Sequence, residues 1–422
     1  MNQFLLIPIE VRLGVLFVLG ACAGSLTNWA VYALAFHPRP ISPLSRPDPK
    51  APPRRLLDRV PILGWLLLRR EAELHGSRFW VRPMLLEVLL GIGFAALYWW
   101  EIERLGLFPP GLVARPSPAW LLLRLHAVYL AHALLLWLML AASMIDVDEK
   151  TIPDTITVPG TWLGLLLAVV LPWSLLPVVI RAPGQAPLLG FLHLTFPLDW
   201  PAALGGFPQS GSLAIGLGCW WLWCLALMPR AWYGRYGWRR AWRYFAAKLV
   251  REPASYWLLL MGLLGSGGVA AVWFVGGLHW VGLLTALVGM AAAGGLVWLV
   301  RIIGGATLGR EAMGFGDVTL MAMIGAFLGW QTCLLVFFLA PLAGLLVGLI
   351  QLILFREHEI PYGPFLCLAA LAAVVRWDAL WPWAEPIFRL GWFVPAVVLF
   401  CMALMGVMLG AWRVVRTALR GE

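Results

Sequence analysis

Runs of apolar residues long enough to cross a lipid bilayer recur along the whole sequence. A helix needs about 20 such residues to cross a hydrocarbon core of about 30 Å, and this chain reaches that length repeatedly. Of its 422 residues, 61% are hydrophobic and 12% are charged, whereas average soluble domains carry about 25% charged residues. We therefore predict an all-α polytopic membrane protein.

We expect about eleven membrane-spanning segments, with a cytoplasmic loop domain after the first helix. The fourth segment contains Pro159, and the eighth is short. The predicted segments are 13–36, 83–100, 127–145, 157–180, 211–228, 256–276, 280–300, 318–330, 332–355, 362–376 and 391–412.

The basic residues predict how the chain is oriented in the membrane. The formal net charge is +10, and cytoplasmic loops of membrane proteins accumulate Lys and Arg. The loop 37–82 holds ten basic residues against four acidic ones, and 230–252 holds seven against one. Membrane lipids explain this charge better than nucleic acid does. The N-terminus is then outside, and the expected cytoplasmic segments are 37–82, 146–156, 230–252, 301–317, 356–361 and the C-terminus.

Two acidic clusters stand at predicted cytoplasmic membrane edges. Asp146, Asp148 and Asp154 follow the third apolar segment, and Asp317 immediately precedes the eighth. Carboxylates at a membrane edge are costly and tend to be functional. Gly314 and Gly316 stand just before Asp317, where they would let an extended substrate backbone approach closely.

Asp146 and Asp317 are the predicted catalytic pair. Two carboxylates that approach within a few Å cannot both ionise, so one holds a proton while the other acts as a base. The base can activate water and the acid can protonate the carbonyl oxygen or the leaving amine. On spacing alone, an ordinary solvated turn explains Asp146, Asp148 and Asp154 equally well, because helix ends favour Asp.

Glu87 lies inside the second apolar segment, about one turn past Arg82. A charge there needs a partner, and we expect a structural ion pair with a cytoplasmic Arg or else a contact with a substrate or cofactor. The six cysteines, at positions 22, 219, 224, 333, 367 and 401, form no CxxC pair. The sequence therefore predicts no metal site.

At these residues the chain resembles the bacterial type IV prepilin peptidases, which are intramembrane aspartyl peptidases of the GxGD type. Residues 143–159 resemble the first aspartate motif of that family, and 313–317 with 325–330 resemble the second. Further similar stretches are 24–32, 58–69, 82–87 and 360–365. These ordered matches cover most of the chain outside 181–300 and the last segment.

The resemblance implies cleavage of a basic leader from type IV prepilins or type II secretion pseudopilins at the cytoplasmic face of the bacterial inner membrane. It assigns catalysis to Asp146 and Asp317, without a cofactor, and gives Asp148, Asp154, Gly314, Gly316 and Glu87 supporting places. Asp148 and Asp154 stay open as alternative catalytic partners. It also implies N-methylation of the new terminus with S-adenosylmethionine as the methyl donor.

Departures from the family pattern keep other interpretations open. The first cytoplasmic loop lacks the paired cysteines of many members, Thr319 stands where a Lys is frequent, and Ala33 stands where an Arg is frequent. A peptidase without methyltransferase activity, an inactive scaffold of a pilus or secretion system, and a transporter-like component are the alternatives.

The resulting division of the chain has six parts. A first helix (1–36), a cytoplasmic loop associated with methyl transfer (37–82) and helices carrying the first aspartate motif (83–180) come first. An insertion (181–300), the GxGD core (301–376) and a C-terminal helix with a basic tail (377–422) follow. The insertion adds an even number of spans, which keeps Asp317 on the cytoplasmic side.

Overall fold

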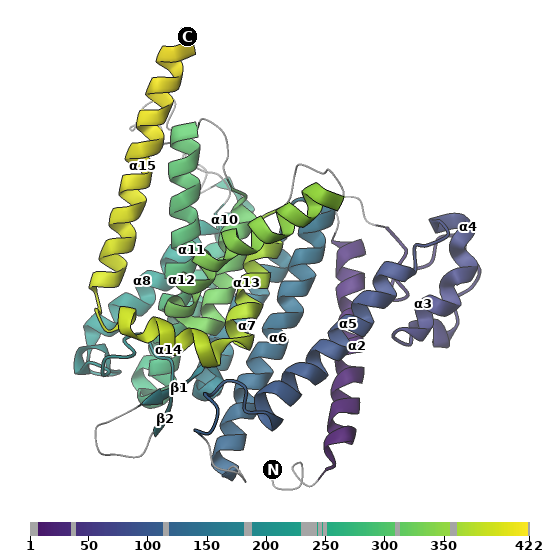
Figure 1. Ribbon diagram of the computed structural model, residues 1–422, viewed down its shortest axis with the longest axis horizontal. Coiled ribbons are helices and arrows are strands. Elements are labelled where there is room, and N and C mark those ends of the chain that lie inside the picture. The colour runs from purple at the N-terminus through teal and green to yellow at the C-terminus, as the bar shows by residue number, and fades with distance from the viewer. Residues whose placement is uncertain are drawn as a thin grey trace.

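The computed structural model describes residues 7–34, 39–112, 118–180, 188–228, 243, 247, 251–308, 313–354 and 361–420. These residues form a bundle of apolar helices and one two-stranded sheet (Figure 1). The predicted all-α class is confirmed, because the sheet is a single short hairpin beside long helices.

The N-terminal helices form a close pair with a small folded loop at one end. α2 (Ile9–Ala33) packs against α5 (Val81–Tyr98), which continues as the π-helical turn η3 (Trp99–Glu103). A Cβ on Gly20 would lie 2.5 Å from the Leu90 carbonyl oxygen, so this close crossing needs a small residue. The folded loop between the two helices contains η1 (Leu56–Arg59), α3 (Leu63–Leu67), η2 (Leu68–Glu71) and α4 (Ala72–His75).

The centre of the bundle is built around α12 (Phe315–Leu354). Its most apolar stretch is 72% buried, the highest share among the helices that could cross a membrane. The helices around it are α6 (Ala119–Glu149), α7 (Asp154–Val170), α11 (Gly277–Leu308) and α13 (Gly363–Val375).

α12 is broken at Gly329, whose dihedral angles (φ 76°, ψ 167°) are open to glycine and not to other residues. Two residues later, the Gln331 side chain donates hydrogen bonds to the carbonyls of His193 and Leu194. Gly344, further along, lies against the ring of Phe365 near the start of α13. The chain thus runs from the Asp317 end of the bundle to the opposite end and returns. The predicted boundary between the eighth and ninth segments, at residue 331, lies next to this break.

Short elements close the end of the bundle opposite to Asp317. β1 (Pro177–Ile180) pairs antiparallel with β2 (Leu188–Phe191), with Pro177 opposite Phe191. α14 (Trp377–Phe388) meets α13 at 95°, and Trp377 donates a 2.7 Å hydrogen bond to the Pro177 carbonyl. The remaining elements are η4 (Pro172–Ser174), η5 (Ala202–Leu204), α8 (Ser210–Ala226), α10 (Pro253–Val275) and α15 (Phe393–Arg420).

The predicted number of eleven membrane-spanning segments is wrong. Within the described ranges, seven helices are long and apolar enough to span, or eight if the bent pair α13–α14 forms one span. α7 and α8 have 17 residues each, so two predicted segments form shorter helices. An apolar run shows that a segment is buried or faces lipid, but not that it crosses the membrane. Most of the basic segment 230–252 lies outside the described residues.

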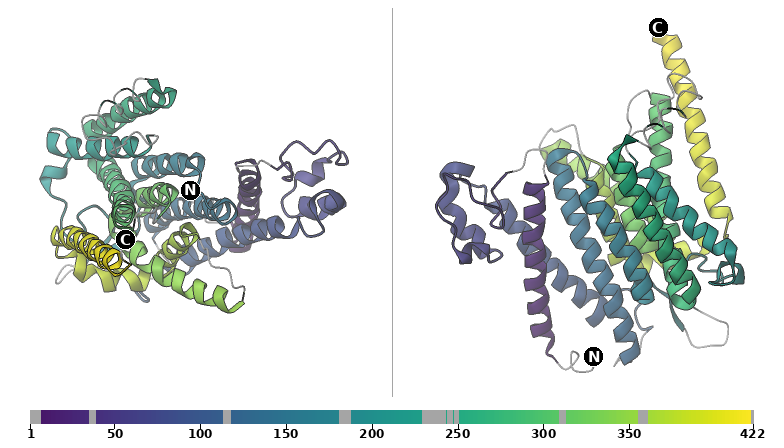
Figure 2. Two further views of the ribbon diagram at one scale, coloured as in Figure 1. Left: turned by 90° about the horizontal axis from the view of Figure 1, so that it is seen from above. Right: turned by 180° about the vertical axis from the view of Figure 1, so that it is seen from behind.

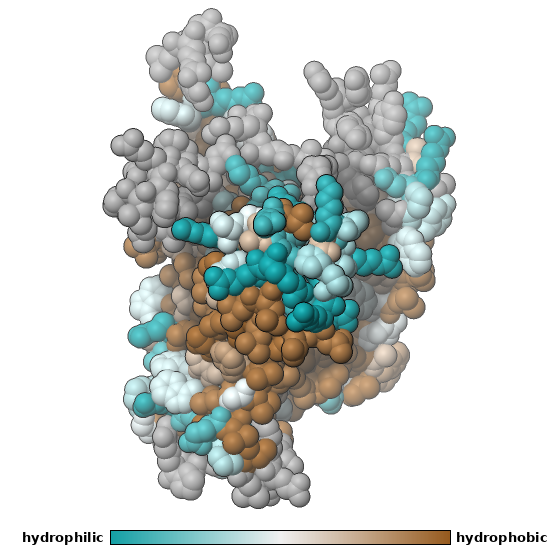
Figure 3. Space-filling view, turned by 90° about the vertical axis from the view of Figure 1, so that its right-hand side faces the viewer, coloured by the Kyte–Doolittle hydropathy of each residue, from teal (hydrophilic) through white to brown (hydrophobic). Residues whose placement is uncertain are grey.

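The folded loop and the C-terminal end of α15 lie at the same end of the bundle, and the start of α2 lies at the other (Figure 2). On the face that carries α2 and α5, an apolar surface lies beneath a band of hydrophilic side chains (Figure 3). Large apolar side chains of these helices are exposed there, which fits a lipid environment. They include Val11, Val15, Val18, Leu85 and Leu89.

Candidate active site

Asp146 and Asp317 come from two helix ends that meet at one end of the bundle. Asp146 lies in the last turn of α6, which ends where Lys150 adopts a left-handed conformation (φ 53°). Asp317 lies in the first turn of α12. Their side chains are buried, with 5% and 7% of each residue exposed. Asp146 is near enough to Asp317 for the two charges to act on each other.

Gly363 and Gly316 allow the segments around the pair to approach closely. A Cβ on Gly363, at the start of α13, would lie 2.5 Å from Oδ2 of Asp146. A Cβ on Gly316 would lie 2.8 Å from Cβ of Ile152 and 3.1 Å from its backbone nitrogen and oxygen. Any larger residue would push α12 or α13 away from the end of α6.

Backbone amides face both carboxylates. The N–H of Gly314 donates to Asp317, and the N–H of Gly363 faces the carboxylate of Asp146. Oδ2 of Asp146 is buried and has no hydrogen-bond partner among the described residues. A buried polar atom without a partner is costly, and such atoms in native proteins often have a catalytic role. This arrangement supplies one carboxylate to hold a proton and one to act as base.

The other two aspartates of the first cluster are engaged elsewhere. Asp148 forms an ion pair with Arg82, at 2.7 Å from Nη1 to Oδ1, and this pair joins the start of α5 to the end of α6. Asp154, at the start of α7, is within hydrogen-bonding reach of the Thr319 hydroxyl. Both contacts tie the surroundings of the pair together.

Glu87 lies on α5. The sequence predicts a cationic partner for it, but the described residues that contact it are uncharged. The carboxylate is fully buried, and it accepts hydrogen bonds from uncharged donors on α2 and on the folded loop. These donors are Ser25 Oγ (2.7 Å), Asn28 Nδ2 (3.2 Å), Trp65 Nε1 (2.8 Å) and the backbone N–H of Ile62. None of its described contacts involves Asp146 or Asp317. Because four neutral donors satisfy this carboxylate, it needs no ion pair.

Sequence reasoning missed the contribution of α13. The side chain of Cys367 lies close enough to interact with the charges of both Asp146 and Asp317, and it hydrogen-bonds Ser143. The segment that starts α13 attracts notice through its resemblance to a family motif. Nothing in its composition shows that its glycine meets Asp146, because that contact joins residues more than 200 positions apart.

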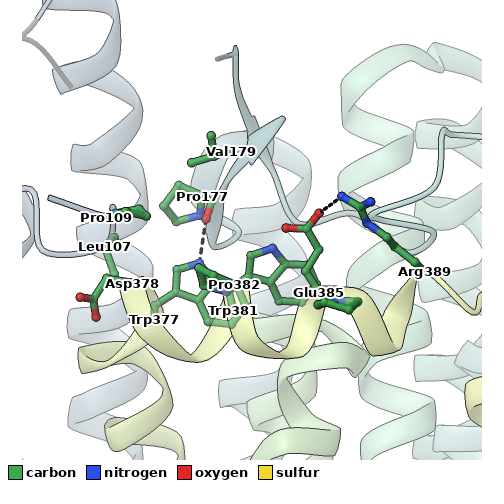
Figure 4. Close-up of a pocket in the computed structure, with 11 residues that line it drawn as sticks. Leu107, Pro109, Pro177, Val179, Trp377, Asp378, Trp381, Pro382, Glu385 and Arg389 are labelled. Atoms are coloured by element: carbon green, nitrogen blue, oxygen red, sulfur yellow. Dashed lines mark hydrogen bonds and ion pairs between the residues drawn. The ribbon is translucent and has the colours of Figure 1, made fainter. Parts of the chain in front are cut away.

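A second group of carboxylates, at the opposite end, does not form a comparable pair. Asp378 and Glu385 of α14 line a cavity of about 290 Å³ together with Trp377, Trp381 and several prolines (Figure 4). Glu385 is seven positions after Asp378 on the same helix, which corresponds to about 10 Å along the helix axis. Glu385 is also paired with Arg389 at 2.7 Å. Asp378 and Glu385 are therefore too far apart along the helix to share a proton.

Comparisons with known proteins match most of the chain to one family. A sequence model of the Type IV leader peptidase family matches residues 133–234 and 245–349, which include both aspartates. A second model, the Bacterial Peptidase A24 N-terminal domain, matches residues 18–101. The chain belongs to the type IV leader peptidase family.

Relatives of this family with curated names are prepilin leader peptidase/N-methyltransferases. The protein from Aeromonas hydrophila is 23% identical over 335 residues, which cover 78% of this chain and 71% of the relative. Shorter matches reach 37% identity over 102 residues in Aeromonas salmonicida (23% of this chain, 33% of the relative). In Pseudomonas aeruginosa the identity is 35% over 101 residues (23% of this chain, 33% of the relative). No solved structure matches the chain with comparable significance.

Proposed function

We propose that this chain is an aspartic endopeptidase that removes the leader from prepilins or type II secretion pseudopilins at the cytoplasmic edge of the bacterial inner membrane. The observation that carries the proposal is the buried pair Asp146 and Asp317 at one end of a membrane bundle. The printed names of the relatives support the substrate class. Membrane lipids surround the apolar bundle, and the C-terminus is cytoplasmic.

The proposed chemistry needs the two carboxylates in opposite protonation states. The ionised carboxylate takes a proton from a water molecule, which attacks the scissile carbonyl carbon. The protonated carboxyl group donates its proton toward the carbonyl oxygen. The carboxyl group that took the proton from water then passes it to the leaving amine as the C–N bond breaks, and the other regains a proton from a hydroxyl of the tetrahedral intermediate. Gly316 lets the start of α12 pack against Ile152, which lies in the loop after α6.

N-methylation of the new terminus is a second candidate function, because the relatives' names include it. S-adenosylmethionine would supply the methyl group. The folded loop offers it no free buried carboxylate among the described residues, since Asp58 pairs with Arg70 and Glu71 with Arg54. Incubating the protein with labelled S-adenosylmethionine and a processed pilin tests this activity separately from cleavage.

The test of the peptidase compares the wild type with Asp146→Asn and Asp317→Asn on a prepilin in detergent. Removing a general acid or base costs about 10²–10⁴-fold in rate, so each variant is expected to lose cleavage while it stays folded. Asp148→Asn and Asp154→Asn are the matched controls and are expected to keep most of the activity. Normal cleavage by Asp317→Asn would contradict the proposal. A wild type that is inert on several prepilins would favour the inactive scaffold or the transporter-like component.

A further inference from the structure

Arg301, near the end of α11, contacts the segment of the chain that leads into Asp317. Its Nε donates a 3.1 Å hydrogen bond to the Met313 carbonyl. Its guanidinium lies over the ring of Phe315, 5.6 Å from the ring centroid, which is within the range of about 6 Å at which a cation and an aromatic face attract each other. Arg301 therefore holds the chain on both sides of Gly314.

Gly314, between these two contacts, lies against the carboxylate of Asp317. Its N–H donates a hydrogen bond to that carboxylate, and such a bond is directional, so its strength depends on where the peptide group is held. Glycine has no side chain that could hold it there, and a Cβ added to Gly314 would meet no atom nearer than 3.4 Å. The contacts of Arg301 supply a restraint that the glycine itself lacks.

α11 fixes the backbone of Arg301 relative to α12, because the two helices pack closely through small residues. A Cβ on Gly294 would lie 3.3 Å from the Val318 carbonyl oxygen, and a Cβ on Gly289 would clash with the Gly325 carbonyl oxygen at 2.3 Å. Small residues let membrane helices approach to this distance. Arg301 follows Gly294 by seven residues, or about 10 Å along the helix, so it extends from a well-anchored stretch of α11.

We propose that Arg301 is a positioning residue for cleavage, which acts by holding the segment before Asp317. This inference rests on the proposed peptidase function. Arginine suits this place better than lysine does, because its planar guanidinium can donate a hydrogen bond and stack on a ring at the same time. A misplacement of about 1 Å in a catalytic group can cost about 10²-fold in rate, so a residue that acts through the main chain can control kcat.

The experiment measures cleavage of a prepilin in detergent by the wild type, Arg301→Met, Arg301→Lys and Arg413→Met. Methionine keeps an unbranched apolar stem, but it carries no charge and no N–H donor. Arg413 provides the matched control, because its guanidinium also donates to a main-chain carbonyl, that of Ala306 at 3.0 Å, and not to the segment before Asp317.

For Arg301→Met we expect kcat to fall about tenfold while KM changes little, because the lost contacts orient Asp317 and do not hold the substrate. Arg301→Lys keeps the charge and a donor, so it should recover part of the lost kcat. Arg413→Met is expected to keep the wild-type kcat. A wild-type kcat in Arg301→Met, or an equal loss in Arg413→Met, would overturn the proposal.

Hydrogen exchange of the segment 313–317 gives a readout independent of turnover. Exchange there is expected to be faster in Arg301→Met than in the wild type or Arg413→Met, while 318–330 exchanges as in the wild type. An equal gain over 318–330 would overturn the proposal, because Arg301 would then stabilise α12 as a whole. A wild type that cleaves no prepilin would instead overturn the proposed function, and the exchange of 313–317 would still show whether Arg301 holds this segment.

Discussion

At the scale of single residues, Gly316 determines how closely the start of α12 approaches the loop after α6. A Cβ there would meet the backbone of Ile152 at 3.1 Å, so Gly316→Ala has to displace Asp317 relative to Asp146. A misplacement of about 1 Å in a catalytic group can cost about 10²-fold in rate. We expect a loss of this order in kcat for cleavage, with the protein still folded in detergent.

Gly314→Ala is the matched control for that substitution. Its Cβ would come no nearer than 3.4 Å to Oδ2 of Asp317, which is an ordinary van der Waals contact. We expect kcat to stay within a few fold of the wild type. Equal losses in the two variants would mean that this segment tolerates no side chain for some reason other than the packing of Gly316 against Ile152.

The sequence predicts the residues of the pair better than it predicts their neighbours. Asp146 and Asp317 stand out because each lies where an apolar run meets polar residues. The distribution of Lys and Arg predicts that both lie on the same side of the membrane. The contact of Gly363 with Asp146 depends on how α13 packs, and no local pattern encodes it. The sequence also does not reveal the neutral donors around Glu87, because Trp65 and Ile62 look like ordinary apolar loop residues.

At the scale of elements, the folded loop depends on ion pairs that respond to pH. Burial alone would raise the pKa of Asp58, but its hydrogen bonds with the Arg70 guanidinium and the Arg55 backbone outweigh burial and hold the pKa below the usual carboxyl value. A lowered pKa in the folded state adds stability above the unfolded value of about 3.9. That stability is lost as the pH falls through the folded pKa.

We therefore expect hydrogen exchange in 39–80, corrected for its intrinsic pH dependence, to stay constant from pH 7 to 5 and to rise below about pH 4. Asp58→Asn removes the titrating group, so its exchange should start higher and change less with pH. The same pH profile in the wild type and in Asp58→Asn would show that another group controls the loop.

Glu87 fastens this loop to α2 and α5. Glu87→Gln puts an amide donor among four existing donors, and leaving a buried donor unpaired costs about 1–3 kcal/mol. We expect a lower unfolding temperature in detergent and faster proteolysis of 39–80. Ser25→Ala, which removes one of the four donors and keeps the carboxylate, should have a smaller effect. Equal effects of the two variants would contradict the role of the Glu87 charge as the anchor.

The elements themselves were predicted unevenly. Apolar runs located nearly every long helix, and the boundary beside Gly329 was placed within two residues. The sharp bend between α13 and α14 was not predicted, because it is accompanied by a hydrogen bond from Trp377 to the distant Pro177 carbonyl and by the stacking of Trp377 on Trp381. A bend of this kind depends on tertiary contacts, and the hydrophobic periodicity of the sequence holds no information about them.

At the scale of the whole molecule, the basic segments gather at the end of the bundle that holds Asp146 and Asp317. Arg413 of α15 donates to the Ala306 carbonyl at the end of α11, so the basic tail lies on the same side as the start of α12. The folded loop leads directly into the start of α5, where Arg82 pairs with Asp148 at the same end of the bundle. Because basic segments stay in the cytoplasm, this end with Asp146 and Asp317 should be cytoplasmic.

Single cysteines in a background without the native ones test this orientation in intact spheroplasts with a membrane-impermeant maleimide. Lys150 and Ala202 are both exposed, at opposite ends of the bundle. Ala202→Cys should react in intact spheroplasts, whereas Lys150→Cys should react only after the membrane is opened. The reverse pattern would place the carboxylates outside the cell. A leader held in the cytoplasm could not reach them there, so the same measurement decides whether the site can act on the proposed substrate at all.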